Sequence, residues 1–303
     1  MKLTPRMKKF LTVFAVLTVV LTVSGCTVPR DADGQIVLIK TTTTFSATMS
    51  SENWFSAIFV WPLAQWINQM SPVVGVGLAI SIVTIVVNGV LALLTLKSTV
   101  AMQQMQLIQP ELEKIQRKYE GRDDDTSKMR QASEMQALYK KYNINPAGSL
   151  LVTFIQFPVI MAMYMAVQRS YAVATGTFMG MDLQTKPLAG LQKAIGGDVS
   201  GWMYLVLFVF MGICQFFSMM LPQWTARKKA EQEAAKHHKK PEKPSTQNKI
   251  MQYYMMGMIL IFGLMWPAAM ALYWAINSLV NIAKTYLVQK YIDKQNVAKE
   301  GNQ

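Results

Sequence analysis

Cysteine, histidine and charged residues are scarce in this chain. Of its 303 residues, 16% are charged and 51% are hydrophobic, with two cysteines and two histidines. Two cysteines exclude a disulfide framework, and Cys214 lies in an apolar run where we expect it to be a packing residue. The GxxxxGK phosphate loop is missing, so nucleotide chemistry is not indicated. This balance is typical of a polytopic membrane protein.

The first 26 residues predict a lipoprotein signal. A basic start precedes an apolar core over 10–23, which is short for a membrane span. Val23, Ser24 and Gly25 then stand directly before Cys26, in the manner of a lipobox. Cleavage there would leave Cys26 as an N-terminal residue that carries acyl chains. The alternative is an uncleaved signal anchor in which Cys26 is an ordinary cysteine.

Apolar runs of about 20 residues, long enough to cross a bilayer, divide the rest of the chain. They predict five transmembrane helices. In chain order the predicted segments are a signal peptide (1–25), an outer tether (26–50), an interfacial helix (51–71), the first span (72–97), a cytoplasmic helical hairpin (98–145), the second span (146–168), an outer loop (169–201), the third span (202–222), a basic cytoplasmic loop (223–249), the fourth span (250–266), the fifth span (267–289) and a basic cytoplasmic tail (290–303).

The distribution of lysine and arginine predicts the orientation. Lysine and arginine together are frequent in 98–145 and 223–249, and 290–303 is rich in lysine, whereas 169–201 holds only Arg169, Lys186 and Lys193. Cytoplasmic loops carry the excess of positive charge, so the first three segments face the cytoplasm and the last faces outward. An odd number of spans then places the processed N-terminus outside.

Three segments outside the spans have their own character. The Thr/Ser-rich tether has no helical period and is expected to be flexible. The segment 51–71 contains three tryptophans and is expected to lie on the outer membrane surface. Apolar residues recur at helical spacing on both sides of a turn at 121–125, which predicts the hairpin, and Pro110 should kink its first arm.

Several short motifs, in this order, closely resemble the YidC-type membrane protein insertase family. They are LLTLK (93–97), QPELEKIQ (109–116), ALYK (137–140), NP (145–146), IQFPV (155–159) and LYW (272–274). The lipoprotein signal is similar to that of the Gram-positive members. The resemblance covers most of the chain, from the interfacial helix to the fifth span.

The resemblance implies an all-α protein of the bacterial cell membrane with five spans around a hydrophilic groove. Such a groove is open to the cytoplasm and to lipid and closed on the outside. It would shorten the hydrocarbon path of a polar segment, so a nascent membrane protein could insert without any catalytic step or cofactor. The implied partners are nascent membrane proteins, the ribosome and anionic lipids, with the Sec translocon as a further candidate and no specific nucleic-acid sequence.

The candidate groove residues are the polar or amphipathic ones deep in the predicted spans: Asn88, Gln156, Gln215, Trp274 and Asn277. For each of the polar residues the alternative is an interhelical hydrogen bond that only stabilises the bundle. Together the four polar residues come from four spans, which favours a lined cavity.

Asn88 departs from the family pattern, which places an arginine at this position of the first span; Leu93 likewise replaces a proline. An asparagine keeps hydrogen bonds and loses the charge that would attract acidic tails. We therefore expect a groove that is polar and locally uncharged, with substrate choice set more by tail length and hydrophobicity.

Two other functions compete with membrane insertion. A small solute transporter or channel would usually show internal repeats and ionisable coupling residues, whereas here no repeat is visible and the predicted spans lack Asp, Glu and His. A ribosome- or RNA-tethering protein would rest on the basic loops alone, which cytoplasmic bias already explains.

Overall fold

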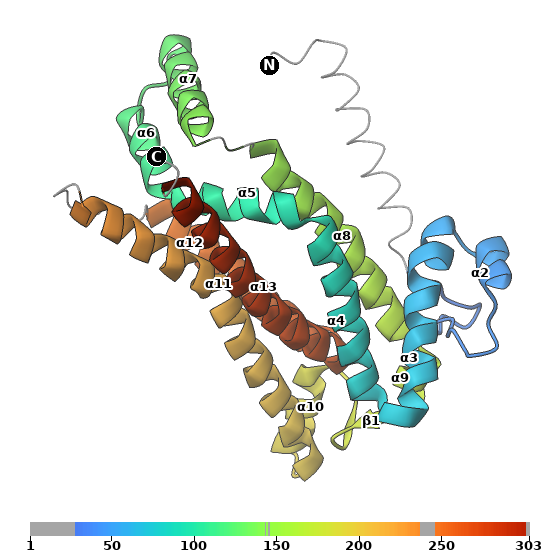
Figure 1. The fold of residues 1–303 in the computed structure, drawn as a ribbon. Helices are drawn as coiled ribbons and strands as arrows, with labels where there is room; N and C mark the ends of the chain where they lie inside the picture. The colour runs from blue at the N-terminus through green and yellow to red at the C-terminus, as the bar shows by residue number, and fades with distance from the viewer. Residues whose placement is uncertain (1–27, 143, 145, 237–245, 301–303) are drawn as a thin grey trace. The chain divides into compact units, whose positions relative to one another are not determined.

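The computed structural model describes residues 28–142, 144, 146–236 and 246–300. The described chain is nearly all helical (Figure 1), so the predicted all-α class is confirmed. The predicted signal peptide and the Cys26 lipidation site lie outside the described residues and stay predictions.

Helices follow one another with short connections. Their bounds are α2 Phe45–Ser51, the π-helical turn η1 Ser56–Val60, α3 Trp61–Val74, α4 Val76–Leu94, α5 Leu96–Leu107, α6 Gln109–Lys118, α7 Asp125–Lys141, α8 Pro146–Arg169, α9 Tyr171–Thr175, α10 Pro187–Ile195, the 3-10 turn η2 Val199–Gly201, α11 Trp202–Lys236, α12 Thr246–Met265 and α13 Ala268–Glu300. The strands β1 (Thr177–Phe178) and β2 (Met181–Asp182) form an antiparallel hairpin in which Thr177 pairs with Asp182.

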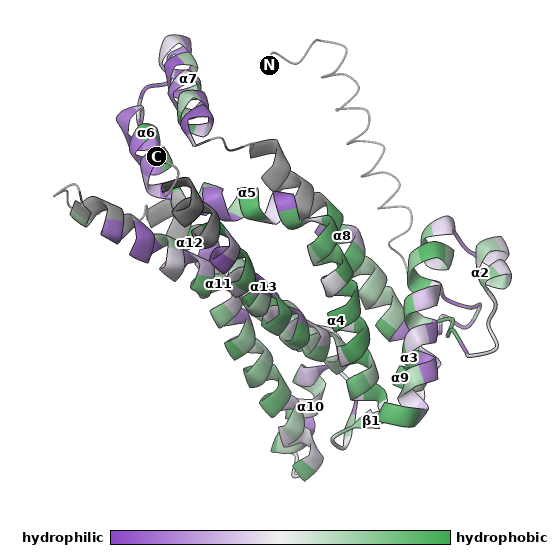
Figure 2. Cartoon of the chain, viewed as in Figure 1, coloured by the Kyte–Doolittle hydropathy of each residue, from purple (hydrophilic) through white to green (hydrophobic). Residues whose placement is uncertain are grey.

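All five predicted spans are helical along most of their length. By length and apolarity, two helices of the described part could cross a membrane: α4 and the segment Val199–Lys229, which contains the first part of α11. The segment Gln252–Met265 of α12 is apolar and shorter. Figure 2 shows hydrophobic residues along α4 and the first part of α11, and hydrophilic residues on α6 and α7. The number of five spans stays a prediction.

The chain divides into two compact units, which we describe separately. The first unit comprises residues 28–83 and 156–185, and the second comprises 84–155 and 186–300. The division cuts α4 and α8, so each unit holds a part of both helices.

In the first unit, the chain before α2 packs against α3 and the end of α8. Ile39 is fully buried, and its N–H donates to the carbonyl of Arg169 at 2.6 Å. The Ile39 carbonyl accepts from the side-chain amide of Asn68 at 2.6 Å and from the N–H of Tyr171 at 3.2 Å. This segment is therefore docked over 37–43, which differs from the flexible tether that its composition predicted.

The predicted tether also contains a helix. Thr44 caps α2, because its hydroxyl oxygen accepts from the N–H of Ala47 at 3.2 Å. The N-cap hydrogen bond satisfies one of the free donors of the first turn and defines where the helix begins. Residues 45–50, predicted as tether, therefore belong to a helix that ends at Ser51.

In the second unit, α11 packs against α10, α12 and α13, and α5 packs against both α11 and α13. Close approach of α10 to α11 depends on Gly190, where a Cβ atom would stand 2.3 Å from ring atoms of Tyr204. Figure 1 shows α11 and α13 running side by side. The pair forms the scaffold on which the polar residues described below are held.

The helices α6 and α7 also pack together within the second unit. Ile108, Leu112, Leu138 and Ile144 form a small apolar cluster. Lys118 and Tyr119 both donate to the Glu134 carboxylate, at 2.6 and 2.8 Å. The Lys118 and Tyr119 hydrogen bonds hold the pKa of Glu134 below its ordinary value.

Pro110 has a different effect from the predicted kink. The first arm is two helices, α5 and α6, that meet at Ile108, and Pro110 lies in the first turn of α6. At that position the missing N–H of proline costs no helical hydrogen bond, so proline starts a helix more readily than it bends one.

Candidate functional site

The five predicted groove residues belong to different units. Asn88, Gln215, Trp274 and Asn277 lie in the second unit, and Gln156, on α8, lies in the first. Only the four in the second unit can be described together.

Asn277 lies on the face of α13 that carries buried polar groups without partners. Its side-chain oxygen is buried and accepts no hydrogen bond within the described residues, and the same holds for the hydroxyl of Tyr273 one turn earlier. Buried polar atoms are normally paired, because an unpaired one costs about 1–3 kcal/mol. The exceptions on α13 therefore mark a place where a further polar partner, such as water or a bound chain, would be favourable.

The helix α5 carries two more such groups. The Thr99 hydroxyl and the side-chain oxygen of Gln103 are buried and unpaired within the described part of the chain. The amide nitrogen of Gln103 donates to the carbonyl of Thr285 on α13, at 3.4 Å. This contact brings α5 to the C-terminal half of α13, so two of the helices with unpaired polar atoms are neighbours.

Gln215 has a defined partner. Its side-chain oxygen accepts from the hydroxyl of Ser278 on α13 at 2.8 Å. The bond joins α11 to α13, so for Gln215 the structure favours a role in holding the bundle over a role in the groove. Ser278 was not among the residues predicted from the sequence. Its position next to Asn277 in the fifth predicted span could have marked it as a further polar residue of the bundle.

Asn88 is buried, with 6% of its surface exposed, and its side-chain nitrogen donates to the carbonyl of Thr84 one turn earlier at 2.9 Å. That hydrogen bond stays within α4. The bond uses one of the two amide hydrogens, so the residue adds polarity to α4 without adding charge.

Trp274 is part of an aromatic stack. Its ring lies 5.3 Å from the ring of Trp266, which in turn lies 5.3 Å from that of Phe262, and both pairs are nearly parallel. Since Trp266 lies in the connection between α12 and α13 and Trp274 lies on α13, the stack packs that tight turn against α13. The structure therefore gives Trp274 a packing role beside any contact it makes with a passing chain.

Lys284 was missed as a candidate. With Lys97 at the very end of the first span, it is one of two charged residues within the five predicted spans; it lies seven residues after Asn277 and is half-buried. No carboxylate of the described residues forms an ion pair with it. Residues seven apart lie on the same face of a helix. The spacing between Asn277 and Lys284 could therefore have indicated Lys284 from the sequence.

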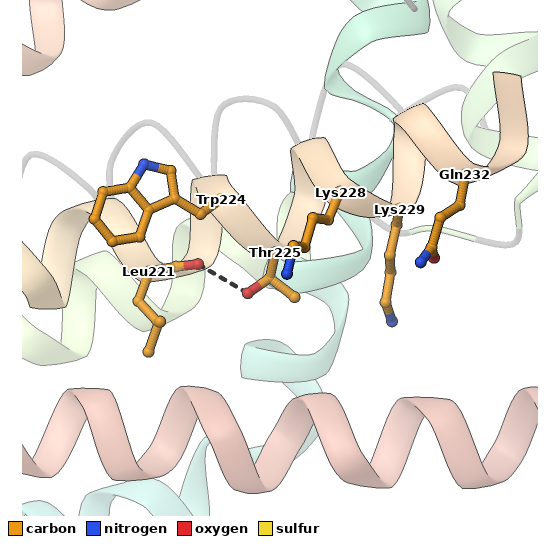
Figure 3. A pocket seen from close by; sticks show the side chains of 6 residues that line it. All are labelled: Leu221, Trp224, Thr225, Lys228, Lys229 and Gln232. Carbon is orange, nitrogen blue, oxygen red and sulfur yellow. Dashed lines mark hydrogen bonds between the residues drawn. The ribbon is translucent and has the colours of Figure 1, made fainter. Parts of the chain in front are cut away.

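A hollow of about 630 Å³ lies on α11, away from the predicted groove residues. Figure 3 shows its lining residues, which all come from that helix: Leu221, Trp224, Thr225, Lys228, Lys229 and Gln232. The Thr225 hydroxyl donates to the carbonyl of Leu221 at 2.9 Å. Lysines next to a tryptophan at the end of an apolar helix are typical of a membrane–water boundary.

Comparison with known proteins gives one consistent result. The family model described as 60Kd inner membrane protein matches residues 66–295. The chain belongs to this family. It is 31% identical over 245 residues to membrane protein insertase YidC 2 of Bacillus anthracis, which covers 80% of this chain and 84% of the relative. The region matched by the family model, 66–295, contains most of the described helices.

Two other relatives carry similar names. Membrane protein insertase MisCA of Bacillus subtilis is 28% identical over 251 residues, which is 82% of this chain and 84% of the relative. Membrane protein insertase YidC of Oceanobacillus iheyensis is 28% identical over 285 residues, 93% of this chain and 97% of the relative. The predicted membership of the YidC-type family is confirmed.

Proposed function

We propose that this chain inserts nascent membrane proteins into the bacterial cell membrane through a polar groove formed by its spans. The family match over residues 66–295 is the observation that carries this proposal. The unpaired buried polar atoms on α5 and α13 support it, because they would be compensated by water or by a polar segment in transit. The activity needs no covalent step and no cofactor.

The proposal uses the five-span topology predicted from the sequence. Spans 72–97, 146–168, 202–222, 250–266 and 267–289 would surround the groove, with 98–145 and 223–249 in the cytoplasm. The basic cytoplasmic segments would face the ribosome and anionic headgroups, and the Sec translocon is a further candidate partner. The helix over 51–71 would lie on the outer surface.

The exposed residues of this helix support its interfacial placement. Trp54, Ile58, Phe59 and Trp66 are each more than 40% exposed, whereas Ala57, Val60 and Ala64 are buried against the first unit. A helix with one packed face and one aromatic, apolar exposed face fits the boundary between headgroups and acyl chains.

Lipidation at Cys26 is part of the same proposal. Acyl chains on an N-terminal Cys26 would anchor the chain on the outer leaflet. Mass spectrometry of the purified protein tests this: we expect a mature chain that begins at modified Cys26. An intact N-terminus at Met1 in most molecules would contradict lipidation and leave the insertion proposal standing.

Reconstitution tests the main proposal. Proteoliposomes that contain only this chain should insert a small, newly synthesised membrane protein, as measured by protease protection of its translocated tail. Empty liposomes are the control. Absence of protection above the control would overturn the proposal. The competing transporter function predicts instead that depletion of the protein changes solute levels while small membrane proteins insert normally, and the names of the relatives do not favour it.

A further inference from the structure

We propose that Lys284 binds acidic side chains of the inserting segment at the cytoplasmic end of the groove, and so makes insertion selective for acidic tails. This inference rests on the proposed insertase function and names a specificity residue for it. It departs from the expectation based on Asn88 alone, that substrate choice depends mainly on tail length and hydrophobicity, because Lys284 adds a positive charge at another level of the bundle. The charged residues within the five predicted spans are Lys97, which is the last residue of the first span, and Lys284, which lies five residues inside the end of the fifth. An ionisable residue at such a place is costly and points to function.

The position of Lys284 around the α13 axis brings it close to the face of Asn277. At 100° per residue, Lys284 lies about 20° from Asn277 and roughly 140° from Leu279. Leu279 and Tyr286, about 140° and 160° from Lys284, are exposed by 43% and 65%, whereas Leu287, about 60° away, is exposed by 64%, so Lys284 lies at the border of the exposed face of this helix. Lys284 thus shares the helix face of Tyr273 and Asn277, whose buried side-chain oxygens have no hydrogen-bond partner among the described residues.

The alternative for a lysine near the end of a span is that it extends to the headgroups. Two observations argue that Lys284 does more than reach the headgroups. Lys284 is half-buried, whereas Tyr286 and Leu287 just beyond it are exposed. The next residue, Thr285, accepts a hydrogen bond from Gln103, so α5 lies against α13 at this level. Lys284 is therefore partly covered by protein at this level of α13.

An inserting segment would contact Lys284 and Asn277 in a defined order. The predicted topology puts the C-terminal end of α13 in the cytoplasm, so a segment entering from that side would meet Lys284 before Asn277, which lies about 10 Å further along the helix. A carboxylate would pair with the amine at the entrance, where water still weakens the pair, and then meet only neutral groups. Capture near the entrance gives selectivity without trapping the segment deep in the groove.

Paired substrates test the proposal in reconstituted proteoliposomes of the full chain. One substrate carries Asp residues in its translocated tail, and its partner carries Asn at the same places. In the Lys284→Gln variant we expect insertion of the Asp form to fall by roughly tenfold, as expected for loss of one hydrogen bond to a charged group. Insertion of the Asn form should stay within twofold of wild type, and Lys284→Arg should keep the preference.

Lys290→Gln is the matched control, because Lys290 is an exposed lysine of the same helix. It should change neither substrate. The Lys284→Glu variant adds a test that a purely structural role would not pass: it should reverse the preference, favouring a tail with Lys over one with Asp. Equal loss of both substrates in Lys284→Gln, no loss of either, or no reversal in Lys284→Glu would overturn the inference.

A lipid phosphate is the other anion that could bind this amine. Repeating the assay at low and high phosphatidylglycerol content separates the two sources. We expect the Asp-specific defect of Lys284→Gln at both contents, and a defect that disappears at low content would assign the amine to lipid and overturn the inference. If wild type inserts neither substrate, the insertase function itself fails. Equal insertion of both by wild type and Lys284→Gln defeats only the role of Lys284.

Discussion

Arg169 and Glu52, 117 residues apart in the sequence, form a buried ion pair in the first unit. The guanidinium donates through Nη1 at 2.7 Å to one carboxylate oxygen and through Nη2 to the other. Its Nε donates to the carbonyl of Val37 at 2.8 Å. One side chain thus ties the last turn of α8 both to the docked segment before α2 and to the residue that ends α2.

Removing this arginine should destabilise the first unit. Arg169 is 1% exposed and the Glu52 side chain 10%, so Arg169→Gln would leave a buried carboxylate without its partner. Breaking one side of a buried pair costs about 3–5 kcal/mol. We expect a lower unfolding temperature in detergent and earlier proteolysis between residues 28 and 52.

Arg227→Gln is the control for this prediction. Arg227 pairs with Glu231 at 2.8 Å on an exposed part of α11, where such pairs contribute about 0–1 kcal/mol. Equal stability of the Arg169 and Arg227 variants would contradict the structural importance of the buried pair.

The role of Arg169 could not be predicted from the sequence. Its position after an apolar span only indicated a loop charge, and its partners Glu52 and Val37 are distant in the sequence. The same holds for the docking of Ile39, which depends on backbone hydrogen bonds to Arg169 and Tyr171. Composition and periodicity report local tendencies, and a Thr/Ser-rich segment without a helical period gives no sign of which backbone it will pair with.

Other features followed directly from local patterns. Apolar residues at helical spacing predicted helices on both sides of the turn that the structure places between Lys118 and Asp125. The polar residues deep in the spans were visible as exceptions within apolar runs. Which of them have partners was not visible, since Gln215 binds Ser278 and Asn277 accepts no bond within the described residues, and only the arrangement of α11 and α13 decides this.

The contact between α6 and α7 should weaken in acid. The pKa of Glu134 lies below its ordinary value near 4.5, because Lys118 and Tyr119 donate to its carboxylate. A lowered folded-state pKa means that the stabilisation is present above about pH 4.5 and is lost as the pH falls through the lowered value. Spin labels on exposed positions of α6 and α7 in the full chain should report a broader distance distribution below that pH.

Glu134→Gln is the control for the acid effect, because its amide does not titrate. The variant should show the broader distribution already at neutral pH and a smaller change in acid. Asp124, whose pKa is also lowered, by Ser127 hydrogen bonds at the start of α7, would account for the remaining change. An unchanged pH response in Glu134→Gln would show that the Lys118 pair does not control the contact.

The helices α6 and α7 should be needed for insertion and dispensable for folding of the spans. Their apolar cluster joins Leu112 of α6 and Leu138 of α7 to Ile108 and Ile144, which flank the two helices, whereas α5 is joined to α13 through Gln103. Replacing residues 109–141 with a flexible linker, and keeping α5, should abolish insertion in proteoliposomes. The unfolding temperature of the remaining protein should change little. Normal insertion by this variant would refute the requirement for α6 and α7.

Asn277 and its neighbour Ser278 allow a direct separation of function from stability. Ser278→Ala removes the hydrogen bond to Gln215, so we expect a loss of about 0.6–1.7 kcal/mol, typical of interhelical hydrogen bonds in membranes, with normal substrate preference. Asn277→Leu removes a buried oxygen that has no partner in the described structure, so stability should stay equal or rise.

The two substitutions should affect insertion in the opposite way: Asn277→Leu should impair it and Ser278→Ala should not. If the Asn277 oxygen compensates polar groups of a passing segment, Asn277→Leu should slow insertion of polar tails while the purified protein unfolds at the same or a higher temperature. Rates in proteoliposomes and unfolding temperatures in detergent, measured on both variants, give the comparison. A residue that costs stability and supports transport is retained for function. If Asn277→Leu instead lowers the unfolding temperature as Ser278→Ala does and leaves insertion intact, Asn277 has a structural role and the polar face of α13 is not the path of the substrate.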